Sequence, residues 1–398
     1  MTVTASPDID LLSGDFWAGD FHAALTWMRR NDPLHFDGRI WGASTYEMVK
    51  DISRHPELFT NSQGIRPDSD ALPMMIDFDD PEHIRRRKLV NRGFTPRRIR
   101  DSEGAIRRAC DEIIDGVCER GECDFVTDMA ALLPMIMIGD ALGVPPERRA
   151  ELLEWSDGMV TALVGSNDSE AAMEAATNAY MGYRMFAEGA IAERRIQPTD
   201  DLMSVLVHAE VDGDRLDHES IIAESLLILI GGDETTRHVI TGGLYQLLQH
   251  PDQRDALAAD PTLMDGAVEE MLRWVTPIRN MNRTVTGDLE YAGKHLKQGD
   301  KVVLLYPSAN RDESVFDDPF RFDITRSPNE HVAFGFGSHF CLGNSLARLE
   351  LSCMFDRLLD RLPDIELVED VEPRNRPANF VSGYESMPIR FTPTAKVG

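Results

Sequence analysis

The residues best suited to chemistry lie in a glycine-rich stretch, residues 334–343, which reads FGFGSHFCLG. Its single cysteine, Cys341, directly precedes residues 342–359, whose apolar side chains recur at steps of four, three and four. That spacing predicts a helix, so Cys341 lies at or just before a helix N-terminus. We expect the backbone amides of such a terminus to lower the pKa of the thiol. A thiolate held in this way could act as a nucleophile or as a metal ligand.

Two features narrow the role of Cys341. No second cysteine or histidine follows at the spacing of a zinc site, which disfavours zinc. A buried structural cysteine is the simplest alternative for a single thiol, but the neighbouring glycines and His339 disfavour it. We expect Gly335, Gly337 and Gly343 to permit turns with positive φ that bring backbone N–H groups close to the sulfur.

A second segment with chemical potential, residues 231–236, reads GGDETT and lies inside an apolar stretch without proline, residues 220–248. Glycine costs about 0.5–1 kcal/mol in a helix interior relative to alanine. Two in succession indicate either close approach of a ligand to the backbone or a local bulge. Glu234 could supply protons and the Thr235 hydroxyl could hold a water molecule. The alternative of a helix N-cap is weaker, because apolar residues precede the glycines.

Three further groups of charged residues have helical spacing. Glu270 and Arg273 stand at i and i+3, where they can pair on one helix face. His83 and Arg87 stand at i and i+4, and arginine suits carboxylate binding. The run of residues 83–100 contains eight Lys or Arg and no acid. Such a run is a solvated helix face, a docking patch for an anionic partner, or a set of ligands for a buried anion.

The elements that must position these residues are mostly helices. Helical patterns cover residues 146–192, 220–248, 263–274 and 342–359, whereas strand patterns are short. The strands are expected at residues 39–43, 364–368 and 388–391, and in a hairpin over residues 290–305 with its turn near residues 297–300. The pattern predicts a mainly α (α+β) protein with a helical core and small peripheral sheets. No repeat or linker divides the chain, so we expect a single domain over residues 1–398.

Composition excludes several classes of protein. The 398 residues are 42% hydrophobic, with 41 basic and 68 acidic side chains, a net charge of −27. That charge argues against nucleic acid as the main partner. No apolar run approaches the roughly 18 residues of a transmembrane segment, and no secretory signal is visible. The odd count of 5 cysteines does not suggest a disulfide framework. These features lead us to expect a cytoplasmic protein.

The pattern F-x-x-G-x-H-x-C-x-G over residues 334–343 resembles the haem-binding loop of the cytochrome P450 monooxygenases. The resemblance implies that Cys341 is the axial thiolate ligand of the iron of haem b. Such a ligand pushes electron density onto iron and favours O–O cleavage. In this family the haem lies between the long central helix and the helix after the cysteine loop.

The other motifs match the same family in order and spacing. The resemblance makes Glu234 and Thr235 the acid–alcohol pair that delivers protons to dioxygen, and Glu270 and Arg273 a structural pair. Asp233 stands where the family has a variable residue, so two acids are adjacent, and the register favours Glu234. The residues implied as ligands of the haem propionates are His83, Arg87, Arg283 and His339.

Four segments resemble, within that family, the mycobacterial monooxygenases that oxidise the cholesterol side chain at its terminal methyl. They are GIRPD at residues 64–68, ALPMMID at 71–77, LIGGDETTRH at 229–238 and RPANFVSGYESMP at 376–388. The implied function is hydroxylation of cholesterol or cholest-4-en-3-one in sterol catabolism. The residues expected to contact the substrate are Leu72, Met75, Ile76, Leu226, Leu227, Ile230, Phe380 and Val381.

The resemblance also implies partners. An acidic ferredoxin, reduced by an NAD(P)H-dependent ferredoxin reductase, would supply electrons and dock on Arg85, Arg86, Lys88 and Arg92. Other functions remain open: a monooxygenase of a fatty acid, terpene or polyketide, a peroxide-using hydroxylase, or a haem-binding sensor without turnover. The pair Glu234–Thr235 disfavours the last two, because neither needs a proton relay.

Overall fold

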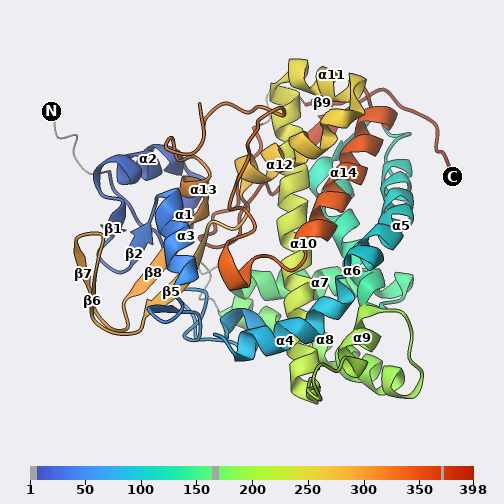
Figure 1. The fold of residues 1–398 in the computed structure, drawn as a ribbon. Coiled ribbons are helices and arrows are strands. Elements are labelled where there is room, and N and C mark those ends of the chain that lie inside the picture. Colours follow the sequence, from blue (N-terminus) through green and yellow to red (C-terminus); the bar gives the residue numbers. More distant parts are fainter. Residues whose placement is uncertain (1–6, 164–169, 369–371) are drawn as a thin grey trace.

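The computed structural model describes residues 7–163, 170–368 and 372–398 of the chain. Helices surround one long central helix and the strands form small sheets at the edges (Figure 1), which confirms the expected mainly helical class. The helices are α1 (Gly14–Ala18), α2 (Phe21–Asn31), α3 (Tyr46–Arg54), α4 (Glu82–Val90), α5 (Pro96–Asp115), α6 (Leu132–Leu142), α7 (Arg149–Leu163), α8 (Glu170–Ile196), α9 (Leu202–His208), α10 (His218–Gln249), α11 (Pro251–Ala259), α12 (Met264–Val275), α13 (Tyr306–Ala309) and α14 (Asn344–Arg361). The strands are β1 (Leu34–Phe36), β2 (Trp41–Ala43), β3 (Phe59–Thr60), β4 (Glu122–Asp124), β5 (Asn280–Val285), β6 (Leu289–Tyr291), β7 (Lys294–Leu296), β8 (Lys301–Leu305), β9 (Glu366–Leu367) and β10 (Pro388–Arg390).

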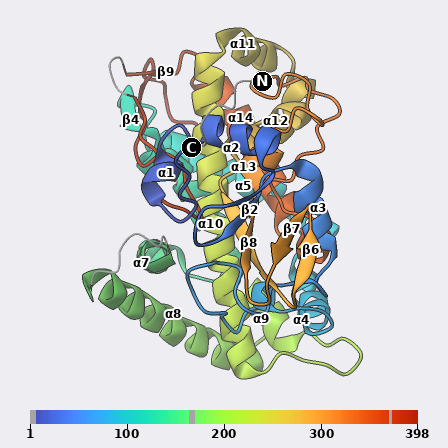
Figure 2. The same cartoon turned by 90° about the vertical axis from the view of Figure 1, so that its left-hand side faces the viewer.

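The central helix α10 organises the molecule. Its N-terminus is capped by Asp217, whose carboxylate accepts a hydrogen bond from the Ser220 amide at 2.7 Å. Most of its side chains are buried, because neighbouring helices pack around it. Helices α6, α12 and α14 pack against it. Figure 2 shows α10 running through the length of the molecule, with α7 and α8 near one end.

The sheets lie at the periphery. The largest has the order β1-β2-β8-β5-β3, in which β8 pairs parallel with β2 and antiparallel with β5. Strands β4, β10 and β9 form a second sheet, and β6 with β7 a third. The hairpin turn lies at Ala292 and Gly293, which have φ of 52° and 74°. Residues 297–300 do form the predicted turn, in which the Asp300 amide donates to the Lys297 oxygen at 3.0 Å. The turn joins β7 to β8 and does not close a hairpin over residues 290–305, because β8 pairs with β2 and β5.

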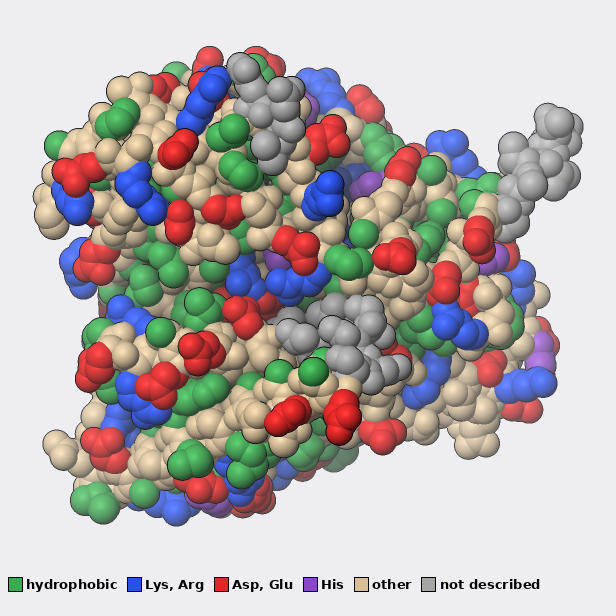
Figure 3. Space-filling model, turned by 180° about the vertical axis from the view of Figure 1, so that it is seen from behind, with side chains coloured by type: hydrophobic (Ala, Val, Ile, Leu, Met, Phe, Trp, Pro, Cys, Tyr) green, Lys and Arg blue, Asp and Glu red, His purple; other side chains and the backbone are tan. Residues whose placement is uncertain are grey.

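The helical pattern over residues 146–192 corresponds to two helices, α7 and α8, with residues 164–169 between them outside the described part of the chain. Within the described residues, no helix is both long and apolar enough to span a membrane. Figure 3 shows one face of the molecule, on which acidic and basic side chains are interspersed. The net charge of −27 is therefore not gathered into one acidic patch on that face.

Candidate active site

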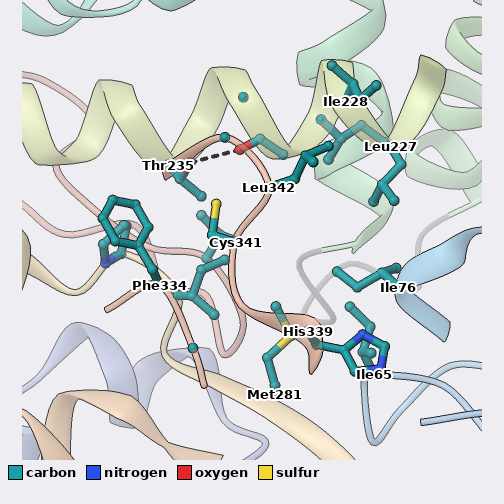
Figure 4. Close-up of a pocket in the computed structure, with 18 of the residues that line it drawn as sticks. Ile65, Ile76, Leu227, Ile228, Thr235, Met281, Phe334, His339, Cys341 and Leu342 are labelled. Atoms are coloured by element: carbon teal, nitrogen blue, oxygen red, sulfur yellow. Dashed lines mark hydrogen bonds between the residues drawn. The ribbon is translucent and has the colours of Figure 1, made fainter. Parts of the chain in front are cut away.

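A cavity of about 310 Å³ separates α10 from the cysteine loop, residues 334–343. Helix α4, strand β5, the loop after β3 and the carboxyl-terminal segment close its sides. Figure 4 shows the Cys341 sulfur pointing toward α10, where Thr235 lies across the cavity. The residues implied to bind haem, His83, Arg87, Arg283, His339 and Cys341, all line this one cavity.

The cysteine loop depends on two glycines. Gly335 and Gly337 have φ of 72° and 79°, the left-handed region that favours glycine. A Cβ at Gly337 would lie 2.7 Å from the Ser53 carbonyl oxygen, too close to be accommodated. The Cys341 amide donates to the Phe334 oxygen at 2.9 Å and closes the loop. The prediction of positive φ at Gly343 was wrong: its φ is −82°, because it is the N-cap residue of α14.

The expected lowering of the Cys341 pKa is also wrong for this structure. Burial raises the pKa of the thiol more than its surroundings lower it. Hydrogen bonds from the Gly343 and Asn344 backbones, and the charges of Arg87 and Arg348, act in the lowering direction. The sulfur opens onto the cavity, which explains why Cys341 is only half-buried by accessible surface although protein surrounds it. A metal cation in the cavity would supply the positive charge that keeps a coordinating thiolate deprotonated.

The cations around the cavity fit a group that carries two carboxylates. Arg283 is buried, and burial lowers its pKa. Arg283 donates to the Asn282 carbonyl oxygen at 2.8 Å, and Arg87 donates to the Phe340 carbonyl oxygen. Among the described residues, no carboxylate forms an ion pair with either arginine. A buried arginine, Arg283, and a half-buried one, Arg87, share the cavity with a cysteine sulfur, and this set fits the propionates and iron of a haem.

The two histidines lie together at the edge of the cavity. The rings of His83 and His339 stack, with centroids 3.9 Å apart. His83 Nδ1 lies 3.1 Å from the Asp80 carboxylate. Burial and the nearby His83, Arg283 and Arg87 lower the pKa of His339 to about 2, so this ring is neutral in the protein alone. Neutral stacked rings at this place can donate N–H groups to an anion.

On α10, Thr235 lines the cavity and its hydroxyl donates to the Gly231 carbonyl oxygen at 2.8 Å (Figure 4). The helix continues through residues 231–236, so the local bulge is not formed. An added Cβ at Gly231 would meet nothing within 4 Å, whereas one at Gly232 would lie 2.6 Å from Ile138 of α6. Gly231 thus leaves room for a ligand, and Gly232 permits close packing of two helices.

Neither adjacent acid lines the cavity. Glu234 is buried on another side of α10, where it contacts Arg237, His238 at 3.1 Å and Arg376 at 3.3 Å. Asp233 accepts a hydrogen bond from the Ser156 hydroxyl at 2.7 Å, and burial raises its pKa. Each residue advances a helix by about 100°, so an acid next to Thr235 in sequence points elsewhere. A proton from Glu234 can reach the cavity only after these ion pairs rearrange.

Seven of the eight residues expected to contact substrate line the cavity: Leu72, Met75, Ile76, Leu227, Ile230, Phe380 and Val381. Leu226 does not line it and is packed in the helical core. It precedes Thr235 by nine residues, a rotation of about 180° around the helix, so the two side chains point in opposite directions. The expectation for Leu226 was wrong for this reason.

Sequence reasoning missed other apolar lining residues, namely Ile65, Ile228, Ile278 and Met281. Ile228 precedes Thr235 by seven residues, about two helical turns, so helical spacing from Thr235 could have identified it. Ile278 and Met281 come from the chain entering β5 and from β5 itself, and no local pattern marks them. The pairing of β5 with β8 places Met281, and an isolated bridge to Val381 places Ile278.

The structural pair lies outside the cavity. Glu270 and Arg273 are fully buried and form two parallel hydrogen bonds of 2.8 and 2.7 Å. Arg273 also donates to the carbonyl oxygens of Asn310 and Pro319, at 2.8 and 3.0 Å. The pair therefore ties α12 to the chain that leads into the cysteine loop.

In the structure, some cations of the basic run, residues 83–100, pair with acids and others have no acidic partner in the described part of the chain. Arg85 pairs with Glu82, and Arg86 pairs with Glu82 and with the buried Glu224. Lys88 and Arg92 are exposed, and none of the described residues forms an ion pair with them. Only part of the run is thus available to a partner.

Comparisons with known proteins identify the class. A family model described as Cytochrome P450 matches residues 170–387. The chain is 56% identical to the steroid C26-monooxygenase of Mycobacterium tuberculosis (strain ATCC 25618 / H37Rv), over 100% of both chains. It is 36% identical to the methyl-branched lipid omega-hydroxylase of Mycobacterium bovis, over 97% of this chain and 95% of that protein.

Two solved structures agree with this assignment. CYP109E1 from Bacillus megaterium in complex with testosterone has a TM-score of 0.85 and 33% identity, over 93% of this chain and 98% of that chain. CYP268A2 of Mycobacterium marinum in complex with pseudoionone has a TM-score of 0.87 and 34% identity, over 98% of this chain and 100% of that chain. The chain belongs to the cytochrome P450 family. Membership implies a haem iron held by a cysteine thiolate, and Cys341 is the cysteine whose sulfur faces the cavity.

Proposed function

We propose that residues 1–398 form a single monooxygenase domain that hydroxylates the terminal methyl of a steroid side chain. The substrate would be cholesterol or cholest-4-en-3-one, with dioxygen as the oxidant. The observation that carries the proposal is the cavity in which Cys341 faces Thr235 between walls of aliphatic side chains. The relative named steroid C26-monooxygenase, at 56% identity, supports the choice of substrate.

The proposed cofactor is haem b, with Cys341 as its axial ligand. When bound, the haem supplies the activation of dioxygen with electrons received one at a time. Arg87 and Arg283 would hold its propionates by charge-assisted hydrogen bonds, and His83 and His339 would add N–H donors. The protein then orients the substrate, keeps bulk water out and delivers protons.

Proton delivery would involve two residues with different tasks. The Thr235 hydroxyl, already inside the cavity, would hold a water molecule and pass its proton. Glu234 would act as the acid that replenishes this proton from another side of α10, about 100° around the helix from Thr235. Its contacts with Arg237, His238 and Arg376 hold Glu234 away from the cavity. Glu234 could therefore deliver a proton only after these ion pairs break.

The aliphatic wall would select substrate by shape and by buried area, at about 25 cal/mol per Å². A terminal methyl C–H bond is stronger than the tertiary C–H bond beside it. Oxidation at the end of the chain therefore requires a narrow passage that shields the weaker bond. Ile76 and Val381, both branched and both lining the cavity, are placed to form such a passage.

Electrons would come from an acidic ferredoxin and its NAD(P)H-dependent reductase in the cytoplasm. The exposed cations Lys88 and Arg92 lie on and just after α4, the helix that also carries Arg87. A docking site there would be close to the haem. Arg85 and Arg86, already held by acids, would contribute less.

The experiment that tests the proposal combines binding and product analysis. The haem-containing protein is titrated with cholesterol, cholest-4-en-3-one and a methyl-branched fatty acid while its absorption spectrum is recorded. Turnover is then compared with ferredoxin, reductase, NAD(P)H and dioxygen against peroxide alone. We expect tight binding of the steroids and a 26-hydroxy product only with the electron-transfer chain. Failure to bind either steroid, or oxidation of the rings, would overturn the substrate, and turnover with peroxide alone would overturn the electron supply.

A further inference from the structure

Residues 72–78, here called the roof segment, cover the cavity without belonging to a long helix or a strand. Leu72, Met74, Met75 and Ile76 of this segment line the cavity, and residues Met75–Asp77 form a single 3-10 turn. One attachment comes from Asp77, whose carboxylate accepts from the Ile65 and Leu72 amides at 2.8 and 2.7 Å. That attachment shapes the segment locally but does not connect it to the core helices.

A second attachment connects the roof segment to α10. The carboxylate of Glu224, on α10, accepts a hydrogen bond from the Met75 amide at 2.9 Å. Glu224 is fully buried, and its other carboxylate oxygen has no hydrogen-bond partner. A buried glutamate with one oxygen unpaired is costly, which argues that it serves a purpose beyond stability.

Arg86 of α4 completes the arrangement. Its guanidinium donates to Glu224 at 3.0 Å, to Glu82 at 3.0 Å and to the Pro73 carbonyl oxygen at 3.3 Å. It also lies over the ring of Phe78, 4.5 Å from the centroid. Arg86 therefore holds both ends of the roof segment, while Glu224 holds its middle.

The contacts of Arg86 and Glu224 with the roof segment are here called the clamp. The position of Glu224 on α10 relates the clamp to Thr235. Glu224 precedes Thr235 by eleven residues, which is about three helical turns and about 16 Å on nearly the same face. Ile228 and Gly231, which line the cavity, lie between them on that face. The clamp thus fixes the roof relative to the helix that carries Thr235.

We propose that Arg86 and Glu224 act as a pair of positioning residues that hold the roof segment and thereby determine which carbon of the substrate is oxidised. The inference rests on the proposed function for the identity of the substrate. Neither residue touches the reacting atoms, and both act through Met75 and Ile76. This role replaces the expectation that Arg86 docks the ferredoxin.

The charge on Glu224 gives the clamp a dependence on pH. Burial raises the pKa of Glu224 to about 7, against the lowering effect of Arg86 and of the Met75 amide. The charged groups that face it are Arg86 and, more weakly, Glu82, both from α4. As pH falls through about 7 the carboxylate takes up a proton and its attraction to Arg86 weakens. The same proton stabilises the fold, because the folded pKa lies above that of an unfolded glutamate. Lowering the pH therefore loosens the roof segment but raises the stability of the fold.

The test compares Arg86→Gln, Glu224→Gln and the double variant with matched controls. Arg184→Gln and Glu219→Gln are the controls, because these two residues form an exposed ion pair between α8 and α10 at 2.7 Å, away from the roof segment. The readout is the ratio of terminal to tertiary hydroxylation. We expect a roughly tenfold fall in that ratio for each single variant, no further fall in the double variant, and no change in the controls.

Two further readouts separate positioning from general damage. The wild-type ratio should fall between pH 8 and pH 6, and Glu224→Gln should remove that dependence while the unfolding midpoint stays within a few degrees. Unchanged product ratios in folded variants, or an equal fall in the controls, would overturn the proposal. If the wild type binds no steroid, the proposed function fails, and the ratio of oxidised positions on a bound fatty acid still tests the clamp.

Discussion

The two walls of the cavity are built by different means. On the cysteine side, backbone geometry places the sulfur: Gly335 and Gly337 adopt positive φ, and the Cys341 amide bonds to the Phe334 oxygen. On the α10 side, side chains on a regular helix determine the surface, and rotation about the helix axis decides which of them face the cavity. Thr235 faces it, whereas Glu234, its neighbour in sequence, does not.

This difference predicts that the two walls tolerate substitution differently. A loop held by backbone conformation needs particular residue types at particular places, so its sequence is a recognisable motif. A helix face can be altered one side chain at a time without loss of the helix. We therefore expect substitutions on the cysteine side to abolish function, and those on the α10 side to change its rate, its coupling or its products.

The largest effect is expected for Cys341→Ala. The variant lacks the only cysteine sulfur that lines the cavity in the described structure, so the haem loses its thiolate ligand. The absorption spectrum of the reduced, CO-bound protein should lose its thiolate signature, and hydroxylation should stop. Cys353→Ala is the control, because Cys353 is buried in the core away from the cavity. A thiolate spectrum in Cys341→Ala would contradict the assignment.

On the opposite wall, Glu234→Gln should slow turnover about 100-fold, within the usual range for loss of a general acid. Asp233→Asn should change turnover less than about twofold, because burial already favours the protonated form of Asp233. The measurement is the turnover rate in water and in deuterium oxide, with a larger solvent isotope effect expected for Glu234→Gln. Equal losses in both variants would remove the distinction between the two acids.

Thr235→Ala should divert reducing equivalents rather than stop their consumption. Without the hydroxyl, water in the cavity is poorly held, so hydroxylated product per electron should fall about tenfold and peroxide should appear. Thr241→Ala is a matched control: its hydroxyl makes the same backward bond, to the Arg237 carbonyl oxygen at 2.9 Å, but does not face the cavity. Unchanged coupling in Thr235→Ala would exclude the residue from proton delivery.

The same contrast between walls shows what could be predicted from the sequence. The cysteine loop was recognisable because its glycines are required by geometry, and α10 and α14 were visible in their apolar spacing. The helical angle between neighbours predicts that Glu234 points away from the side that Thr235 faces. Its contact with Arg376 was not predictable, since that residue lies 142 residues away in the chain. The position of Leu226 was predictable, but it was assigned to the cavity because it is apolar. Its angle from Thr235 around the helix would have placed it in the core. The role of Arg86 depends on Glu224 and Pro73, which no local pattern connects to it.

A smaller effect, on products alone, is expected for cavity residues outside these two walls. Ile76→Ala and Val381→Ala should widen the passage and move oxidation toward the tertiary carbon severalfold, with the sterol still bound. Leu226→Ala is the contrast, because Leu226 is packed in the core on the opposite side of α10 from Thr235. It should lower the free energy of unfolding by about 2–5 kcal/mol without changing the product ratio. The measurements are product regiochemistry and denaturant unfolding.

The smallest effect should arise outside the cavity, on the surface nearest the cysteine wall. Lys88→Glu together with Arg92→Glu reverses two exposed charges that no described residue pairs. Exposed charges interact weakly and are screened beyond about 10 Å at 0.1 M salt. The rate of reduction by an acidic ferredoxin should therefore fall at low salt and converge with the wild-type rate as salt rises. Arg85→Glu should have less influence, because Arg85 is already paired with Glu82 at 2.8 Å. A wild-type rate that does not depend on salt would place the docking site elsewhere and leave both walls of the cavity as described.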